Sequence, residues 1–375
     1  MLKFAAFGKV QRAIWRSSVG FGRKLLLSAL FCFLLLWGVL NAICLGLDHV
    51  LFPGFRKVRV KRPVFIIAHP RSGTTLTHRL MLKDPGRYSC TRAYECLLPS
   101  ILQKKLVRAL GWVDRRLLGG LLHDFVRSKE SSALGDLQDI HHFSLLEPEE
   151  DEFFYFMTFG SGVSLSLFPY VDEFREVMAY DWMPEAAQRE HLEYYHGCLQ
   201  RQVYLDGEAR VFCSKNTTTF IPKIEPLAEL YPDARFVHIV RNPLEVAPSL
   251  LSLLASTWRQ LGFPEDDIQR GCAVIHRTNM RAYELAFEAF DRMDPGRYCI
   301  IEYRDLVSAP KATMLKVYET LGIEMRPAYA AVLDELQEKA RSHRSGHEYG
   351  LEEYDLTEAG IRAELPTVFE RYQFD

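Results

Sequence analysis

The sequence predicts an α/β protein with a mainly parallel sheet flanked by helices, a helical cap and an N-terminal transmembrane helix. Three observations lead to this fold class. Two segments, residues 64–76 and 236–249, each read as a buried strand followed by a loop and a helix. Between them the chain carries apolar residues at helical spacing, and ahead of them residues 25–47 form an uncharged apolar run.

The apolar run reads LLLSALFCFLLLWGVLNAICLGL over residues 25–47, and these 23 residues are enough to cross a bilayer with some tilt. Its charged flanks argue against a buried core helix, and its length argues against a cleaved signal peptide. The basic segment before it, residues 1–24, fits an amphipathic helix on the membrane surface. Lys and Arg occur on both sides of the run, so the positive-inside rule decides no orientation. We expect a single-pass anchor that keeps the following domain against the bilayer.

The first strand-to-helix unit reads VFIIAHPRSGTTL from Val64. The run Val64–Ala68 is typical of a fully buried central strand, and Gly73 permits a turn that points backbone N–H groups at one anion. Thr74 and Thr75 add hydroxyl donors, and Arg71 adds a fixed positive charge. A simple turn before a Thr-capped helix would give the same letters. We interpret the segment as a P-loop-like candidate phosphate cradle.

The second unit runs from Phe236 to Val240 and continues with Arg241, and Ser249 falls on the helix that Pro243 begins. Two phosphate-facing units indicate a ligand with two phosphate sites. A P-loop kinase needs a Gly-rich loop ending in Lys-Ser/Thr and an acidic residue after a neighbouring strand to hold Mg²⁺. The sequence has neither, and the Arg241 cation would repel a metal. The pattern therefore predicts anion binding without a metal.

These residues resemble the sulfotransferases that use 3′-phosphoadenosine 5′-phosphosulfate (PAPS). The family signature Pro-Lys/Arg-Ser-Gly-Thr-Thr is matched from Pro70 to Thr75, and an Arg with a Ser eight positions later is matched by Arg241 and Ser249. The resemblance covers roughly residue 62 to the C-terminus. It implies that Arg241 and Ser249 grip the 3′-phosphate. It also implies that the 5′-phosphosulfate is wrapped by Arg71, Ser72, Gly73, Thr74 and Thr75.

Three further positions match the family. Lys215, in FCSKN, stands where tyrosylprotein sulfotransferases and bacterial relatives carry a Lys that supports the transferring sulfuryl group. Tyr303 matches a segment near the nucleotide, and the C-terminal residues 346–358 are similar to the large bacterial branch. Glu95 follows Arg71 by 24 positions, close to the spacing of the general base in Glu-dependent sulfotransferases. The alternative bases are Asp151 and Glu152.

The resemblance implies transfer of a sulfuryl group from PAPS to a hydroxyl or amine of a membrane-associated, lipid, glycan or small-molecule acceptor, with release of PAP and no metal. One sulfotransferase domain over residues 63–375, with its helical cap at about 97–210, would carry this activity. A non-catalytic PAP-binding membrane protein and a metal-independent phosphotransferase are the alternatives. The acceptor and the oligomeric state are not set by the sequence.

Composition narrows the location and the partners. The net charge of −2 indicates no nucleic-acid partner. Eight cysteines form no C-x-x-C pair, which favours reduced thiols and a cytoplasmic catalytic domain over a Golgi-lumenal type II orientation. His141-His142 lacks matched ligands for a metal. The aromatic residues between 153 and 170 are expected in the core rather than in an acceptor pocket.

Overall fold

The computed structural model describes residues 3–134, 144–174, 180–340 and 350–374. By its internal contacts the chain divides into two compact units. Unit 1 consists of residues 1–59, 91–164 and 189–207. Unit 2 consists of residues 60–90, 165–188 and 208–375. The boundaries predicted at residues 24, 47, 63, 97 and 210 stay predictions.

The sheet lies within unit 2, and all its strand pairs are parallel, in the order β2-β3-β1-β4-β5. β1 is central and fully buried, as expected for a run with apolar residues on both faces. The sequence-based prediction of a mainly parallel sheet is confirmed. The strands are β1 (Val64–Ile67), β2 (Tyr88–Ser89), β3 (Val211–Asn216), β4 (Arg235–Val240) and β5 (Tyr298–Glu302).

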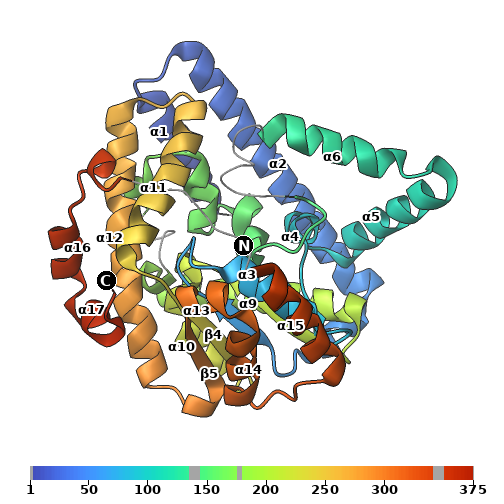
Figure 1. Ribbon diagram of the computed structural model, residues 1–375. Coiled ribbons are helices and arrows are strands. Elements are labelled where there is room, and N and C mark those ends of the chain that lie inside the picture. The colour runs from blue at the N-terminus through green and yellow to red at the C-terminus, as the bar shows by residue number, and fades with distance from the viewer. Residues whose placement is uncertain (1–2, 135–143, 175–179, 341–349, 375) are drawn as a thin grey trace. The chain divides into compact units, whose positions relative to one another are not determined.

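Helices cover both faces of this sheet (Figure 1). Alternate strand residues such as Val64 and Ile66 pack against α3 (Thr74–Leu82), α14 (Pro310–Thr320) and α15 (Pro327–Ala340). On the other face Val240 packs with α11 (Pro243–Gln260), α12 (Glu265–Asp291), α16 (Glu358–Glu364) and α17 (Pro366–Tyr372). Shorter elements of unit 2 are η7 (Thr218–Lys223), α10 (Ile224–Leu230) and α13 (Tyr303–Ser308).

Unit 1 is mainly helical in its described residues, in agreement with the apolar residues at helical spacing between the two strand-to-helix units. Its longest helix, α2 (Phe21–Leu51), is long and apolar enough to cross a membrane. Residues 17–20 are not helical and separate α2 from the preceding helix. The other elements are α1 (Phe4–Arg16), η1 (Pro53–Lys57), α4 (Ala93–Leu97), α5 (Ile101–Val113), η2 (Asp114–Leu118), α6 (Leu121–Leu134), η3 (Asp151–Thr158) and most of α9 (Glu185–Asp206).

Candidate active site

The candidate site lies at the carboxyl edge of the sheet in unit 2. Because the strands are parallel, the chain leaves β1, β3, β4 and β5 at the same edge. Arg71, Lys215, Arg241 and Tyr303 stand at or just after these strand ends. The topology therefore brings together the cations that the sequence places on separate segments. In open α/β sheets this edge, where the strand order reverses on either side of β1, is where ligands bind.

The loop after β1 has an unusual backbone. Arg71 and Gly73 both have positive φ angles, 65° and 90°. A Cβ on Gly73 would lie 2.9 Å from Leu306 Cδ2 and 3.0 Å from Tyr303 Cδ2, so a larger residue would displace packed side chains. A left-handed Arg costs about 1–3 kcal/mol, and such strain concentrates at ligand-binding loops. Helix α3 begins at Thr74, directly after this turn, so its N-terminal N–H groups lie next to the loop.

Ser72 supplies a test of whether a phosphate fits this loop. Its side chain is fully buried, and its Oγ atom has no hydrogen-bond partner. A buried hydroxyl without a partner costs about 1–3 kcal/mol. A phosphate oxygen in the loop would accept from this hydroxyl and from the N-terminal N–H groups of α3. The residues present therefore fit the phosphosulfate that the sequence predicts.

The two predicted anion-binding loops, the one after β1 that contains Arg71 and the one after β4 that contains Arg241, contact each other directly. Arg71 Nε donates to Ser249 Oγ at 3.1 Å, although the family motifs assign these residues to opposite ends of the nucleotide. The Arg241 guanidinium donates to the Arg71 carbonyl and pairs with Glu245 at 2.6 Å. It also lies 4.1 Å from the centre of the Tyr303 ring. The structure thus joins the residues predicted for the 5′ and 3′ ends into one cluster.

Lys215 comes from β3, the strand next to β1. The side chain is 1% exposed, and Nζ donates to Thr75 Oγ1 at 3.4 Å, in the first turn of α3. This contact places a buried cation beside the predicted 5′-phosphosulfate loop. A positive charge there can stabilise negative charge that develops on a bridging oxygen.

Two buried side chains of α12, Asn279 and Tyr283, contact residues of both loops, and we call this pair the α12 brace. It was not predicted from the sequence. His69 stacks on the Tyr283 ring with centroids 3.6 Å apart, and its Nδ1 contacts Asn279 Oδ1 at 3.0 Å. The Tyr283 hydroxyl donates to the Arg241 carbonyl at 3.0 Å. Burial, opposed by the Asn279 hydrogen bond, lowers the pKa of His69 to about 3, so the ring is neutral. No local sequence signal identifies these residues, because the contacts join positions about 40 to 210 residues apart.

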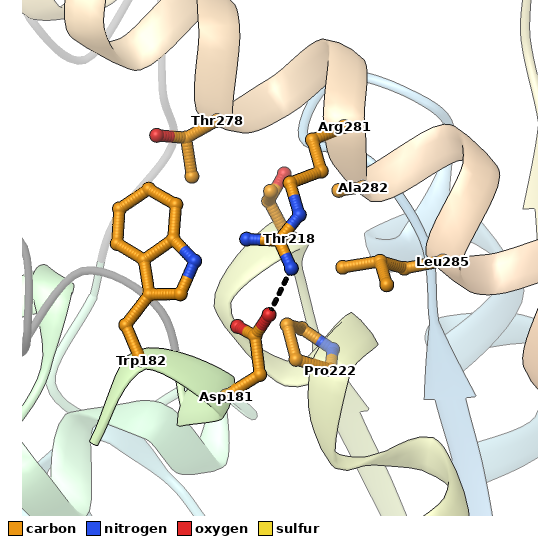
Figure 2. A pocket seen from close by; sticks show the side chains of 8 residues that line it. All are labelled: Asp181, Trp182, Thr218, Pro222, Thr278, Arg281, Ala282 and Leu285. Atoms are coloured by element: carbon orange, nitrogen blue, oxygen red, sulfur yellow. Dashed lines mark hydrogen bonds and ion pairs between the residues drawn. The ribbon is translucent and has the colours of Figure 1, made fainter. Parts of the chain in front are cut away.

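Thr218, on η7 after β3, links the brace to a small pocket. Its hydroxyl donates to the same Asn279 Oδ1 at 3.0 Å. Figure 2 shows Arg281 reaching across the pocket to pair with Asp181, and its guanidinium lies 5.3 Å from the Trp182 ring centre. The cavity volume of the pocket is about 10 Å³, which is room for roughly one water molecule. Ligand pockets usually measure about 300–1,000 Å³, so this one is too small for a large acceptor.

Glu95, the predicted base, lies in α4 of unit 1. The residue is 2% exposed, and four donors surround its carboxylate. Oε1 accepts from Arg108 at 2.8 Å and Tyr94 at 3.3 Å, while Oε2 accepts from the Arg92 N–H at 3.0 Å and Gln202 at 3.3 Å. Burial raises the pKa of Glu95, but the Lys104 charge and the bonds from Arg108 and Arg92 outweigh it, so the pKa lies below its ordinary value.

The alternative bases are equally enclosed within unit 1. Asp151 accepts from Thr91 Oγ1 at 2.6 Å and from the Tyr195 hydroxyl at 2.8 Å. Glu152 accepts from Ser161 Oγ. Most members of the predicted aromatic core are buried, as expected: Phe154, Tyr155, Phe159 and Phe168.

Within the described ranges, no group of three or more His, Cys, Asp or Glu side chains is arranged to hold a metal ion. His141-His142 and residues 346–349 of the C-terminal motif lie outside those ranges. None of the eight cysteines, all of which lie within the described ranges, forms a disulfide bond.

A parallel sheet whose carboxyl edge gathers two cationic loops at a helix N-terminus is typical of group-transfer enzymes that bind an anionic ligand. The comparison with known families names the group: the sulfotransferase family model matches residues 63–327. The chain belongs to this family and is an enzyme.

Two named relatives are similar over most of the chain. The omega-hydroxy-beta-dihydromenaquinone-9 sulfotransferase Stf3 of Mycobacterium bovis is 28% identical over 348 residues, covering 88% of this chain and 81% of that protein. The protein of the same name from Mycobacterium tuberculosis gives the same values.

Solved structures share the fold. The crystal structure of sulfotransferase STF9 from Mycobacterium avium aligns with a TM-score of 0.71 at 20% identity, covering 88% of this chain and 82% of the other. Sulfotransferase STF1 from Mycobacterium tuberculosis aligns with a TM-score of 0.70 at 20% identity, covering 97% and 91%. These values confirm the predicted fold class.

Proposed function

We propose that this sulfotransferase moves a sulfuryl group from PAPS to a hydroxyl of a membrane lipid and releases PAP. The observation that carries the donor assignment is the cluster of Arg71, Ser249 and Arg241, since it joins two anion loops on one nucleotide-binding edge. A donor with phosphates at both the 5′ and the 3′ position meets both loops at once. The buried Ser72 hydroxyl and the Gly73 turn supply the cradle.

The reaction needs one bond to form and one to break. The acceptor oxygen bonds to sulfur, the bond from sulfur to the bridging oxygen of the 5′-phosphate breaks, and PAP leaves with the electron pair. In this proposal Lys215 and Arg71 stabilise the charge on the bridging oxygen. The donors from Ser72 to Thr75 hold the 5′-phosphate, Arg241 and Ser249 hold the 3′-phosphate, and Tyr303 packs beside the nucleotide. The acceptor proton passes to a base.

The acceptor assignment rests on the relatives. Their name specifies an omega-hydroxylated menaquinone, which is a lipid with a terminal hydroxyl. The apolar helix α2 agrees with an acceptor that resides in a membrane. A hydroxyl on a long isoprenoid chain is therefore the acceptor class that we propose, ahead of an amine or a soluble alcohol. The eight cysteines, all in described ranges, form no disulfide bond, which agrees with a cytoplasmic site for the transfer.

Calorimetry tests the donor. We expect Arg241→Ala to weaken PAP binding by about 1.5–3 kcal/mol, the range for a hydrogen bond to a charged group. Adenosine 5′-phosphosulfate has no 3′-phosphate, so its affinity should fall much less. Arg259→Ala is the matched control, because Arg259 lies on the same helix α11 and pairs with Glu265 away from the loops. An equal loss for both ligands in Arg241→Ala would refute the 3′-phosphate assignment.

Kinetics test the base. Glu95 is ionised at neutral pH and so is in the form that accepts a proton, although its low pKa makes it a weak base. We expect Glu95→Gln to keep PAP affinity and to lower the rate of ³⁵S transfer from PAPS to a lipid extract about 10²- to 10⁴-fold. The acidic limb of the pH–rate profile should vanish in Glu95→Gln and persist in Lys215→Ala.

A purely structural role for Glu95 makes a different prediction. The carboxylate then serves Arg108 and the start of α4, so Glu95→Gln would lower the thermal midpoint and leave the acidic limb in place. Asp151→Asn and Glu152→Gln are the next variants in that case.

A further inference from the structure

Helix α2 has an outward side that is apolar from residue 25 to residue 47. No Asp, Glu, Lys or Arg occurs between residues 25 and 47. The spacing of three and four residues aligns the outward side chains in one stripe along the helix. Contiguous exposed apolar surface of this size marks a protein or membrane interaction site. The central members of the stripe are all at least 42% exposed: Phe33, Leu36, Leu40, Ile43 and Leu47.

The opposite side of α2 is attached to the rest of unit 1. Asn41 Nδ2 donates to the Leu97 carbonyl at 2.9 Å. Asp48 accepts from the Ile101 N–H at 2.9 Å, at the start of α5, and pairs with Arg201 Nε at 2.8 Å. Nearer its N-terminus, α2 packs against α1 and η3. A helix attached in this way cannot cross a bilayer unless η3, with its buried carboxylates, also enters the hydrocarbon, which is costly.

A second apolar surface lies at the tip of the hairpin formed by α5, η2 and α6, which Figure 1 shows extending away from α2. The turn is well built: the buried Asp114 carboxylate accepts from the Leu122 N–H at 2.9 Å and the His123 N–H at 3.1 Å. Gly119 and Gly120 take positive φ angles of 62° and 92°. Yet this ordered turn holds bulky apolar side chains outward, each 48% to 75% exposed: Leu110, Trp112, Leu117, Leu118, Leu121 and Phe125.

The charges around the hairpin favour an anionic lipid surface as the partner of its apolar tip. Residues 101–134 contain seven Lys or Arg and three Asp or Glu. Arg115 and Arg116 stand at the apolar tip itself, in η2. Apolar side chains that enter the acyl region, bordered by cations at the headgroup level, are typical of a segment that binds anionic lipid surfaces.

We propose that α2 lies in the plane of one membrane leaflet with its apolar stripe immersed, and that the α5–α6 tip inserts into the same leaflet. The protein is then held on one face of the bilayer by two separate elements, and α2 does not span it. This goes beyond the proposed function and does not rest on it, because it holds for any acceptor.

Cysteine labelling tests the topology of α2. In a full-length background with Cys32→Ser and Cys90→Ser, single reporters are placed before and after α2, at Ser18→Cys and Lys57→Cys. Both positions are exposed. A membrane-impermeant maleimide added to sealed vesicles of known orientation should label both reporters from the same side. Labelling from opposite sides would show that α2 spans the bilayer and would overturn the proposal.

Vesicle flotation tests the hairpin. The full-length protein is mixed with vesicles of phosphatidylcholine and phosphatidylglycerol. The triple variant Leu117→Ser, Leu121→Ser, Phe125→Ser should bind these vesicles at least about tenfold more weakly than the wild type. The matched control removes three exposed apolar residues from unit 2, Leu230→Ser, Val307→Ser and Leu315→Ser, and should bind as the wild type does. Equal binding of both triple variants to the vesicles would overturn the proposal that the α5–α6 tip inserts into the leaflet. So would a hairpin variant that changes its oligomeric state in detergent but floats with the vesicles as the wild type does.

Discussion

α2 and α12 are the two longest described helices, with 31 and 27 residues, and they turn opposite kinds of surface outward. The outward side of α12 is charged, whereas that of α2 is apolar. The charged outward side of α12 is typical of a surface that faces water, whereas the apolar outward side of α2 is the surface that we propose to contact a membrane leaflet. The exposed charged residues of α12 are Glu265, Asp266, Arg270, Arg277, Arg281, Glu284, Glu288 and Asp291.

Their inward sides differ as well. Asn279 and Tyr283 of α12 contact neutral groups at the loops, among them the uncharged His69 ring. The inward side of α2 holds an ionised pair, Asp48 with Arg201. Apolar composition thus marks the outer face of α2 and the inner face of α12. The three predictions that follow test this contrast, beginning with the largest effect.

The first prediction concerns the inward side of α2. Asp48→Ala should lower the free energy of unfolding by about 3–5 kcal/mol, because it leaves Arg201 as a buried charge without its partner. Thermal unfolding followed by circular dichroism in detergent measures the change. Leu47→Ala, one residue away on the outward stripe, is the control and should leave stability nearly unchanged. Similar values for both variants would mean that α2 is not part of the folded unit.

The second prediction uses the neutral imidazoles beside α12. Burial lowers the pKa of His238 to about 4, against the opposing effect of its hydrogen bond to the Ile67 carbonyl, and the pKa of His69 to about 3. In the unfolded chain both histidines take up a proton near pH 6.5, whereas in the folded chain they do so only near pH 4 and pH 3. The stability that the two neutral rings contribute is therefore fully present above about pH 6.5 and is lost as the pH falls toward the folded-state pKa values.

Each histidine should contribute a loss of about 2 kcal/mol between pH 7 and pH 5. Denaturant unfolding at a series of pH values measures the slope. His238→Leu should flatten it, whereas His123→Gln should not, because His123 is exposed. An unchanged slope in His238→Leu would contradict a buried neutral ring.

The third and smallest effect compares a glycine in each helix. A Cβ on Gly271 of α12 would lie 2.7 Å from the Pro169 carbonyl oxygen and 2.9 Å from Trp258, whereas a Cβ on Gly46 of α2 meets nothing within 4 Å. Gly46→Ala should stabilise the protein by up to about 1 kcal/mol through helix propensity. Gly271→Ala should destabilise it. If both changes stabilise to the same degree, the inner face of α12 is less tightly packed than the structure indicates.

The parallel sheet and the anion loops were predictable because their signals are local. The buried strand after Arg62 was expected at 64–68 and is found at Val64–Ile67, and the strand expected at 236–240 is found at Arg235–Val240. A central strand must be apolar on both faces, which leaves a continuous run in the sequence. The loop residues follow directly on these runs, so their common position at the sheet edge could be deduced.

The remaining features depend on contacts between distant positions. The partners of Glu95 include Gln202, 107 residues away, and no spacing rule reveals them. The apolar run of α2 was evident, but Asn41 and Asp48 gave no indication that they attach its inner side to α5. The α12 brace was missed for the same reason, since Asn279 and Tyr283 are ordinary polar and aromatic residues within an amphipathic helix.

The hydrogen bond between Arg71 and Ser249 has a consequence for donor choice. If the proposed function holds, a nucleotide that fills only one loop would leave this bond in place. A nucleotide with a phosphate at each end would offer acceptors to both Arg71 and Ser249 in exchange for it. The bond would then favour ligands that carry two negative groups at the right separation, and a ligand with only one of them would bind more weakly.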